Sequence, residues 1–246
     1  MKSSETKNST IVKVAGFMFL FAFIGPTLNW AFTLSKFIVK ENVIATANNV
    51  MENQLLFRVG ITIELFMAVS LIILALVLYR IFKQVNKTLA LLALLLKLVE
   101  AAIVVTIVLI SFIALQMLDG QSYLTSFTTD QLKIPLGFIL DSRTLLYSIP
   151  MVFLGLDMMI FAYLFFKSQY IPRIIAAFGI LSFALILIHS LMYIIAPSYA
   201  ALLINQIIFY APSGIFELVI GAWLLTKGIN YKYWEKHSLK VHNIEE

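Results

Sequence analysis

The sequence predicts an all-α integral membrane protein, a bundle of six transmembrane helices that forms a single domain over residues 1–246. Hydrophobic residues make up 61% of the chain and charged residues only 13%, with a mean hydropathy of +0.94. A soluble domain of this size needs more charged residues to cover its surface. The chain also contains apolar runs of about 20 residues, the length that crosses a hydrocarbon core of about 30 Å. These observations exclude a soluble fold.

Six such runs follow one another between polar breaks. Ser9 and Thr10 can cap the first, and Asn86 with Thr88 can start the third, because their side-chain oxygens accept otherwise unpaired backbone N–H groups. No small-residue cleavage site follows the first run, so we interpret it as a retained span rather than a signal peptide. The predicted spans cover about residues 11–34, 55–79, 88–117, 144–166, 174–196 and 201–226.

Two of the connections are long, at about residues 35–54 and 118–143. The second contains apolar residues around Pro135, and these can lie flat at the membrane interface. Both connections fall on the same side of the membrane.

The basic residues predict the orientation. Twelve of the eighteen lie on the side of the two termini and one, Lys97, lies within a span. Because basic residues are retained on the cytoplasmic side, we expect a multi-pass protein of the cell membrane with both termini in the cytoplasm. The net charge of +5 then faces anionic lipid headgroups, and no nucleic-acid partner is expected. The five basic residues of the other side are Lys36, Lys40, Arg58, Lys133 and Arg143.

Several short motifs in a fixed order resemble a known family. They are Leu56-Phe57-Arg58, Leu78-Tyr79-Arg80, Lys97-Leu98-Val99-Glu100-Ala101, Phe153-Leu154-Gly155-Leu156-Asp157, Tyr170-Ile171-Pro172-Arg173-Ile174, and Glu217 followed by Trp223-Leu224-Leu225-Thr226-Lys227-Gly228. Over nearly the whole chain the sequence resembles the domain-of-unknown-function 4386 family of bacterial multi-pass membrane proteins. The resemblance implies a six-helix topology in a bacterial cell membrane, and it implies no established activity.

Ionisable side chains inside the spans are the candidate functional residues, because each costs several kcal/mol unless it is paired or hydrated. Lys97 and Glu100 are three residues apart and can pair on one helix, whereas Arg58 and Glu64 need partners on other helices. The basic and acidic groups nearly balance, which favours mutual pairing. These residues are Arg58, Lys97, Arg143, Glu64, Glu100, Asp157, Glu217 and His189.

Helical phase places polar side chains on common faces. In the last span Gln206, Tyr210, Ser213 and Glu217 fall within roughly 60° of one another. Arg143, Tyr147 and Asp157 share a sector of about 80°, and Ser182, His189 and Tyr193 share a third polar face. Prolines in the outer half of three spans free further carbonyl groups. We therefore expect an outward-opening polar pocket, lined by the ionisable residues above together with Tyr147 and Tyr210.

These groups favour binding or transport of a small polar molecule or a lipid headgroup. An intramembrane enzyme is the alternative, with carboxylates and His189 performing acid–base or metal chemistry on a lipid. The one metal site then conceivable, though not expected, is Asp157, His189 and Glu217. No nucleophile or metalloprotease motif is present, so we favour a protein that is not an enzyme and expect no cofactor.

A third hypothesis is a structural or accessory membrane subunit, in which the charges only hold helices together. The lipid bilayer is the partner common to all three hypotheses. A homo-oligomer is compatible with each, although no Gly-x-x-x-Gly motif marks its interface.

Overall fold

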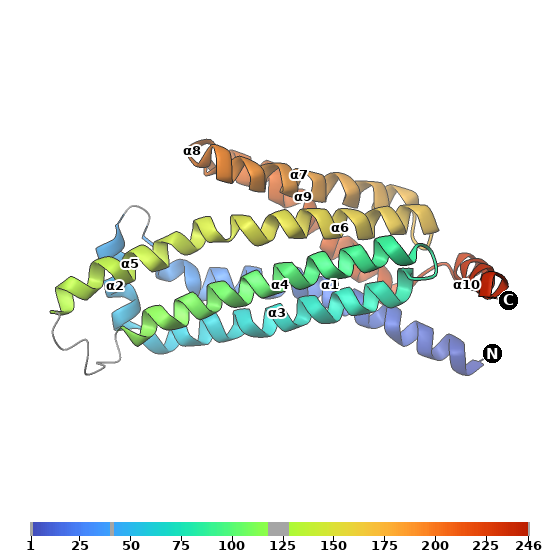
Figure 1. Ribbon diagram of the computed structural model, residues 1–246, viewed down its shortest axis with the longest axis horizontal. Helices are drawn as coiled ribbons and strands as arrows, with labels where there is room; N and C mark the ends of the chain where they lie inside the picture. The colour runs from blue at the N-terminus through green and yellow to red at the C-terminus, as the bar shows by residue number, and fades with distance from the viewer. Residues whose placement is uncertain (1, 40–41, 118–127, 246) are drawn as a thin grey trace.

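The computed structural model describes residues 2–39, 42–117 and 128–245, which are almost entirely helical and contain no strand (Figure 1). Within these ranges six helical segments are long and apolar enough to cross a membrane, which confirms the predicted six-helix class. Five of these crossings are each made by one α-helix, the first of which is extended by a short 3-10 helix, Leu34–Lys36. They are α1 (Lys2–Phe32), α3 (Gln54–Phe82), α4 (Lys87–Gln116), α7 (Arg173–Ile195) and α9 (Leu203–Thr226).

Large apolar side chains cover the outside of the bundle. Phe66 on α3 and Leu109 on α4 are 68% and 55% exposed, and they have many apolar neighbours of similar exposure. Contiguous apolar surface of this extent is unfavourable in water and favourable in a lipid bilayer. The surface thus agrees with a membrane-embedded protein.

The fourth crossing differs from the prediction, because the second long connection is helical in its described part. Helix α5 (Thr129–Leu146) begins after Thr128, which forms a capping box with Gln131. Only Tyr147 separates α5 from α6 (Ser148–Ser168), and the two act as one long apolar segment. The first part of the connection lies outside the described residues.

The apolar residues around Pro135 belong to a helix that continues into the fourth crossing, instead of to a separate segment that lies flat at the interface. Leu136 and Leu140, four residues apart, face the same side of α5 and are buried. They join a small core with Phe37, beside helix α2 (Val43–Glu52) in the first long connection. The apolar side chains of this segment are buried against α2 within the protein, so they do not have to be buried in the membrane interface.

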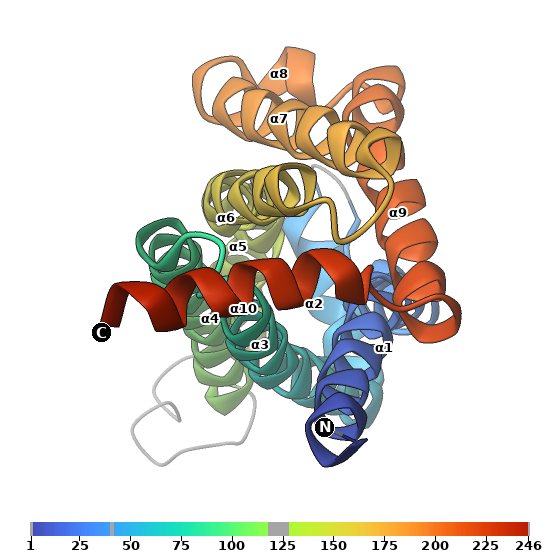
Figure 2. The same cartoon turned by 90° about the vertical axis from the view of Figure 1, so that its right-hand side faces the viewer.

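The end of the bundle that carries the termini has a continuous aromatic core. Phe82 at the end of α3 packs edge-on against Phe165 of α6, with ring centroids 4.6 Å apart, and stacks on Tyr170 at 6.0 Å. Helix α10 (Tyr231–Glu245) lies across this end (Figure 2), and Trp234 contacts Tyr170. The aromatic rings fill the interior of this half, and a second pocket of about 430 Å³ lies at its end, between Tyr170 and Trp223.

Helix α9 is tilted across the bundle. At the end with the termini it lies against α1, where Gly16 and Gly221 allow the two backbones to approach closely. Toward the opposite end it leaves α1 and runs beside α7 and the short helix α8 (Pro197–Ala200) (Figures 1 and 2). The outer parts of α1 and α9 are consequently separated.

Candidate functional site

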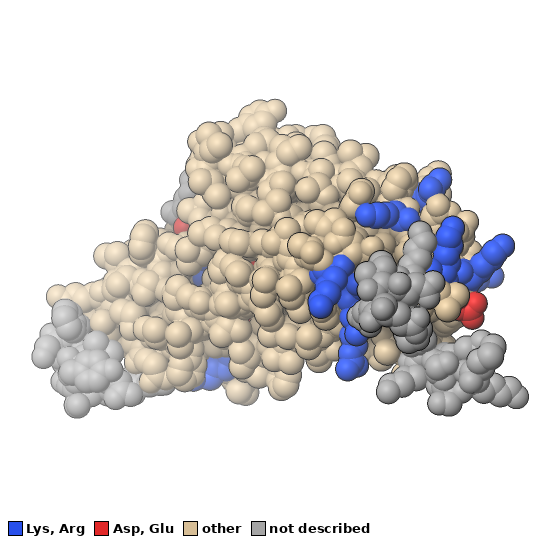
Figure 3. Space-filling model, turned by 45° about the vertical axis from the view of Figure 1, so that its right-hand side comes forward, with Lys and Arg blue, Asp and Glu red and all other residues tan. Residues whose placement is uncertain are grey.

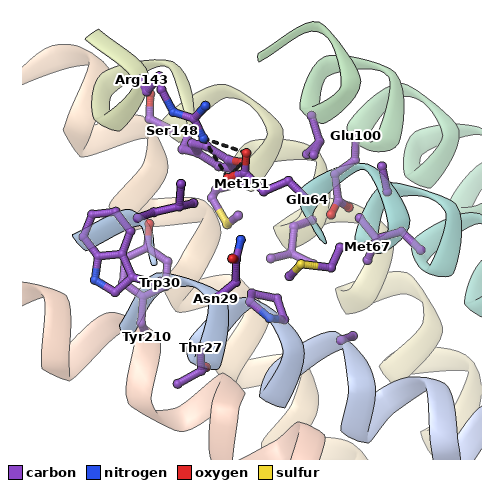
Figure 4. Close-up of a pocket in the computed structure, with 18 of the residues that line it drawn as sticks. Thr27, Asn29, Trp30, Glu64, Met67, Glu100, Arg143, Ser148, Met151 and Tyr210 are labelled. Carbon is purple, nitrogen blue, oxygen red and sulfur yellow. Dashed lines mark hydrogen bonds and ion pairs between the residues drawn. The ribbon is translucent and has the colours of Figure 1, made fainter. Parts of the chain in front are cut away.

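A cavity of about 590 Å³ occupies the half of the bundle away from the termini, between α1, α3 and α9 (Figure 4). Its walls are mainly apolar, with methionine and aromatic side chains from several helices. Pro26, Thr27 and Trp30 of α1 line it and are also exposed, Trp30 to 49%. Gln206 and Tyr210 of α9 line the facing wall. The cavity therefore opens sideways between α1 and α9.

A polar contact explains why α1 leans away from α9 at this level. The Asn29 side-chain amide donates to the backbone carbonyl of Gly60 on α3 at 3.0 Å. The Thr33 hydroxyl donates in turn to the Asn29 side-chain oxygen at 2.6 Å. Buried amides are stable only when hydrogen-bonded, so Asn29 holds the outer part of α1 against α3.

The first charged group of the wall is Glu64 with Arg143. One nitrogen of the Arg143 guanidinium donates to both Glu64 oxygens at 2.7 Å, and the Tyr147 hydroxyl donates to the same carboxylate at 2.6 Å. The other guanidinium nitrogen donates to the Ser111 hydroxyl. The Arg143–Glu64 pair is buried and most of its polar atoms are hydrogen-bonded, so the two charges neutralise each other.

The second charged group surrounds Lys97, which is fully buried on α4. Its ammonium lies 2.7 Å from Glu100, the predicted pair, and 2.8 Å from Asp157 of α6. Lys97 is thus the counter-ion of two carboxylates from different helices. The sequence did not indicate the Asp157 contact, because helical phase relates residues of one helix only.

His189 of α7 lines the cavity and is fully buried. Its Nε2 lies 3.0 Å from the backbone oxygen of Ala200, and its ring packs edge-on against Tyr210 at 4.9 Å between centroids. No partner for Nδ1 is found in the described part of the chain. The ring is therefore anchored at one nitrogen and free at the other.

Glu217 lies two turns deeper on α9 than Tyr210, on the polar face predicted for this helix. Gln206, Tyr210, Ser213 and Glu217 all line the cavity. Glu217 is within electrostatic reach of Lys97 and Glu100. The polar stripe of the last span accordingly faces the interior.

All but two of the predicted pocket residues line this one cavity. The exceptions are Arg58, which contacts other residues, and Asp157, which is buried beside Lys97 instead. At the level of Asp157 the same side of α6 packs against α4, so the space is filled. Ser111, which bonds to Arg143, was not predicted, because a single serine in an apolar helix gives no signal of its partner.

The three residues considered for a metal site do not form one. Asp157 contacts Lys97, and His189 is bonded to a backbone carbonyl. Within the described ranges, no three histidine, aspartate or glutamate side chains gather in a geometry that could hold a metal ion. The geometry offers instead an apolar chamber with a few fixed charges.

Comparison with known proteins places the chain in one family. No curated protein and no solved structure matches the chain. The family model described as "Domain of unknown function (DUF4386)" matches residues 14–228, which include all the residues of the cavity wall. The chain therefore belongs to the DUF4386 family.

Proposed function

We propose that this protein binds an amphipathic small molecule or a lipid inside the membrane, with the polar end of the ligand among the charged groups of the cavity. The observation that carries the proposal is the cavity itself. Its volume of about 590 Å³ is that of typical ligand sites. Apolar walls with a few fixed polar groups favour a ligand of the same mixed character.

The sideways opening supports entry from the bilayer. A ligand that partitions into lipid reaches Trp30 and Thr27 without crossing a layer of water. Tryptophan at such a position is suited to contact with both apolar and polar parts of a molecule. The same opening would let a bound molecule leave on the side to which the cavity faces, as a transport cycle requires.

We further propose that the cavity faces outward from a cell membrane, with both termini in the cytoplasm. Lysine and arginine side chains gather at the end of the bundle near α10 (Figure 3). Arg143, counted at first with the opposite side, is buried in its pair with Glu64 and does not contribute to the charge of that side. The bias in basic residues between the two ends supports this orientation.

Filling the cavity tests the proposal. Leu71 of α3 lines the cavity, whereas Leu76 on the same helix is 48% exposed on the outer surface. We expect Leu71→Trp to lose copurifying lipid or small molecules, identified by mass spectrometry of an organic extract of the purified protein. The control Leu76→Trp should retain them. Equal retention by the two variants would contradict binding in this cavity.

A further inference from the structure

Glu217 differs from the other carboxyl groups of the cavity wall because it has no partner. Glu64 is held by Arg143 and Tyr147, and Glu100 is held by Lys97. Glu217 makes no hydrogen bond or ion pair with any residue in 2–39, 42–117 or 128–245. Lys97 lies nearby, but its ammonium is already bonded to two other carboxylates.

The charges around the cavity do not balance. Three carboxyl groups line the wall, on Glu64, Glu100 and Glu217, and a fourth, on Asp157, is paired with Lys97. Among the described lining residues only Lys97 and Arg143 supply positive charge. A carboxylate without a counter-ion inside a membrane costs several kcal/mol. A positively charged ligand at Glu217 would remove this cost, and an anionic ligand would increase it.

His189 points to the same ligand chemistry independently. Its Nε2 contacts a backbone carbonyl oxygen, which can only accept, so Nε2 donates this hydrogen bond. In the imidazole form Nδ1 is then an acceptor, and it is buried without a partner in the part of the chain that the structure describes. Glu217 and Nδ1 of His189 are thus both acceptors that lack a donor.

Aromatic rings add a second feature that favours a cation. The Phe23 ring packs directly on Gly214, less than one turn from Glu217 on α9, and Trp30, Tyr193 and Tyr210 line the wall toward the mouth. The faces of such rings attract ammonium groups, most strongly where water is excluded.

We propose that the ligand of this cavity is a cationic amphiphile, an organic ammonium on an apolar or aromatic body, and that Glu217 is its counter-ion. The inference rests on the proposed function, that the cavity is a binding site, and adds the charge class of the ligand. In this arrangement the ammonium group lies deep, beside Glu217, and the apolar body extends along the chamber toward Trp30.

The test compares three amphiphiles that share a naphthyl ring and an ethyl arm but end in an ammonium, a hydroxyl or a carboxylate group. Their dissociation constants are measured on the full-length protein in phosphatidylcholine nanodiscs. For the unmodified protein we expect the ammonium compound to bind at least about tenfold more tightly than the alcohol, and the carboxylate to bind most weakly. Glu217→Gln should reduce the affinity for the ammonium compound to about that for the alcohol.

Two matched variants separate the possible failures. Glu52→Gln removes an exposed carboxyl group on α2 outside the cavity and should preserve the preference for the ammonium compound. Leu71→Trp should weaken binding of all three compounds. If the alcohol binds the unmodified protein as tightly as the ammonium compound, the charge class is wrong and the cavity remains a binding site. If none binds, or if Leu71→Trp changes nothing, the proposed function fails as well.

Labelling of the unmodified protein gives a test that does not depend on folding of a Glu217 variant. Dicyclohexylcarbodiimide reacts with unpaired carboxyl groups in apolar surroundings, so Glu217 should be the labelled residue within the cavity wall by peptide mass spectrometry. The ammonium compound should slow this labelling at least about tenfold more than the alcohol does at the same concentration. Equal protection by the two compounds, or preferential labelling of Glu100, would overturn the role of Glu217.

Discussion

The two halves of the bundle are built from similar apolar residues but differ in how they are filled. The half with the termini contains stacked and edge-on rings of Phe82, Phe165 and Tyr170, and its helices approach closely at small residues. The other half encloses a cavity of about 590 Å³. In that half, Asn29 and Arg143 bond to groups on neighbouring helices.

The difference shows what polar groups do inside a membrane bundle. Helices in lipid associate by close packing and interhelical hydrogen bonds, because lipid chains are as apolar as their side chains. Where packing alone determines the distance between helices, they approach as closely as their small residues permit. Where buried polar groups must find partners, their bonds fix the helix positions, and space is left between α1 and α9.

The largest expected effect concerns Lys97, which lies where the two halves meet. Lys97→Met leaves both Glu100 and Asp157 without their counter-ion, so we expect a loss of about 3–5 kcal/mol in the free energy of unfolding. Reversible unfolding in mixed micelles measures this loss. Replacing Glu100 by glutamine in the same chain should recover only part of it, because Asp157 remains unpaired.

The triple variant Lys97→Met, Glu100→Gln, Asp157→Asn should recover most of that loss, since no buried charge is left uncompensated in the group. Losses that simply add across the three substitutions would show that the contacts are not coupled. The boundary between the two halves would then not depend on this ion-pair group.

A smaller effect is expected from adding one methyl group to each half. A Cβ at Gly16 of α1 would lie 2.9 Å from the Gly221 carbonyl oxygen and 3.0 Å from Leu224 Cβ on α9, whereas a Cβ at Gly25 beside the cavity would meet the Phe21 ring and Met67 at 3.7 Å or more. We expect Gly16→Ala to destabilise the protein by about 1–3 kcal/mol. Gly25→Ala should be neutral or stabilise it by up to about 1 kcal/mol. Equal melting temperatures for the two variants would contradict the contrast in packing.

The smallest perturbation is a single cysteine used as a probe of water access. The chain contains no cysteine, so Ser213→Cys and Tyr147→Cys each introduce one thiol on the cavity wall, and Val219→Cys introduces one on the lipid-facing side of α9. A small charged thiol reagent added outside intact cells should label the first two and not the third. Protection at all three positions would indicate a cavity that is dry or faces the cytoplasm.

Much of the candidate site followed from helical periodicity. The polar stripe from Gln206 to Glu217 lies on one helix, and its residues do line one cavity. The pair of Lys97 with Glu100 is equally local and is present. Contacts between helices were not predictable in this way. Glu64 needed a partner elsewhere, but only the tertiary structure identifies Arg143 and Tyr147 as its partners, and Ser111 as the second partner of Arg143.

The sequence alone determined that the chain is a six-helix membrane protein, because hydrophobicity over about 20 residues is a local property of each span. It also determined which polar residues share a helix face, since that depends only on the helical repeat. Tertiary structure decided that α5 continues the fourth crossing, that Lys97 serves both Glu100 and Asp157, and that Glu217 is left without a partner. These features depend on the tilt and separation of helices distant in sequence, which arise from packing and which no single helix specifies.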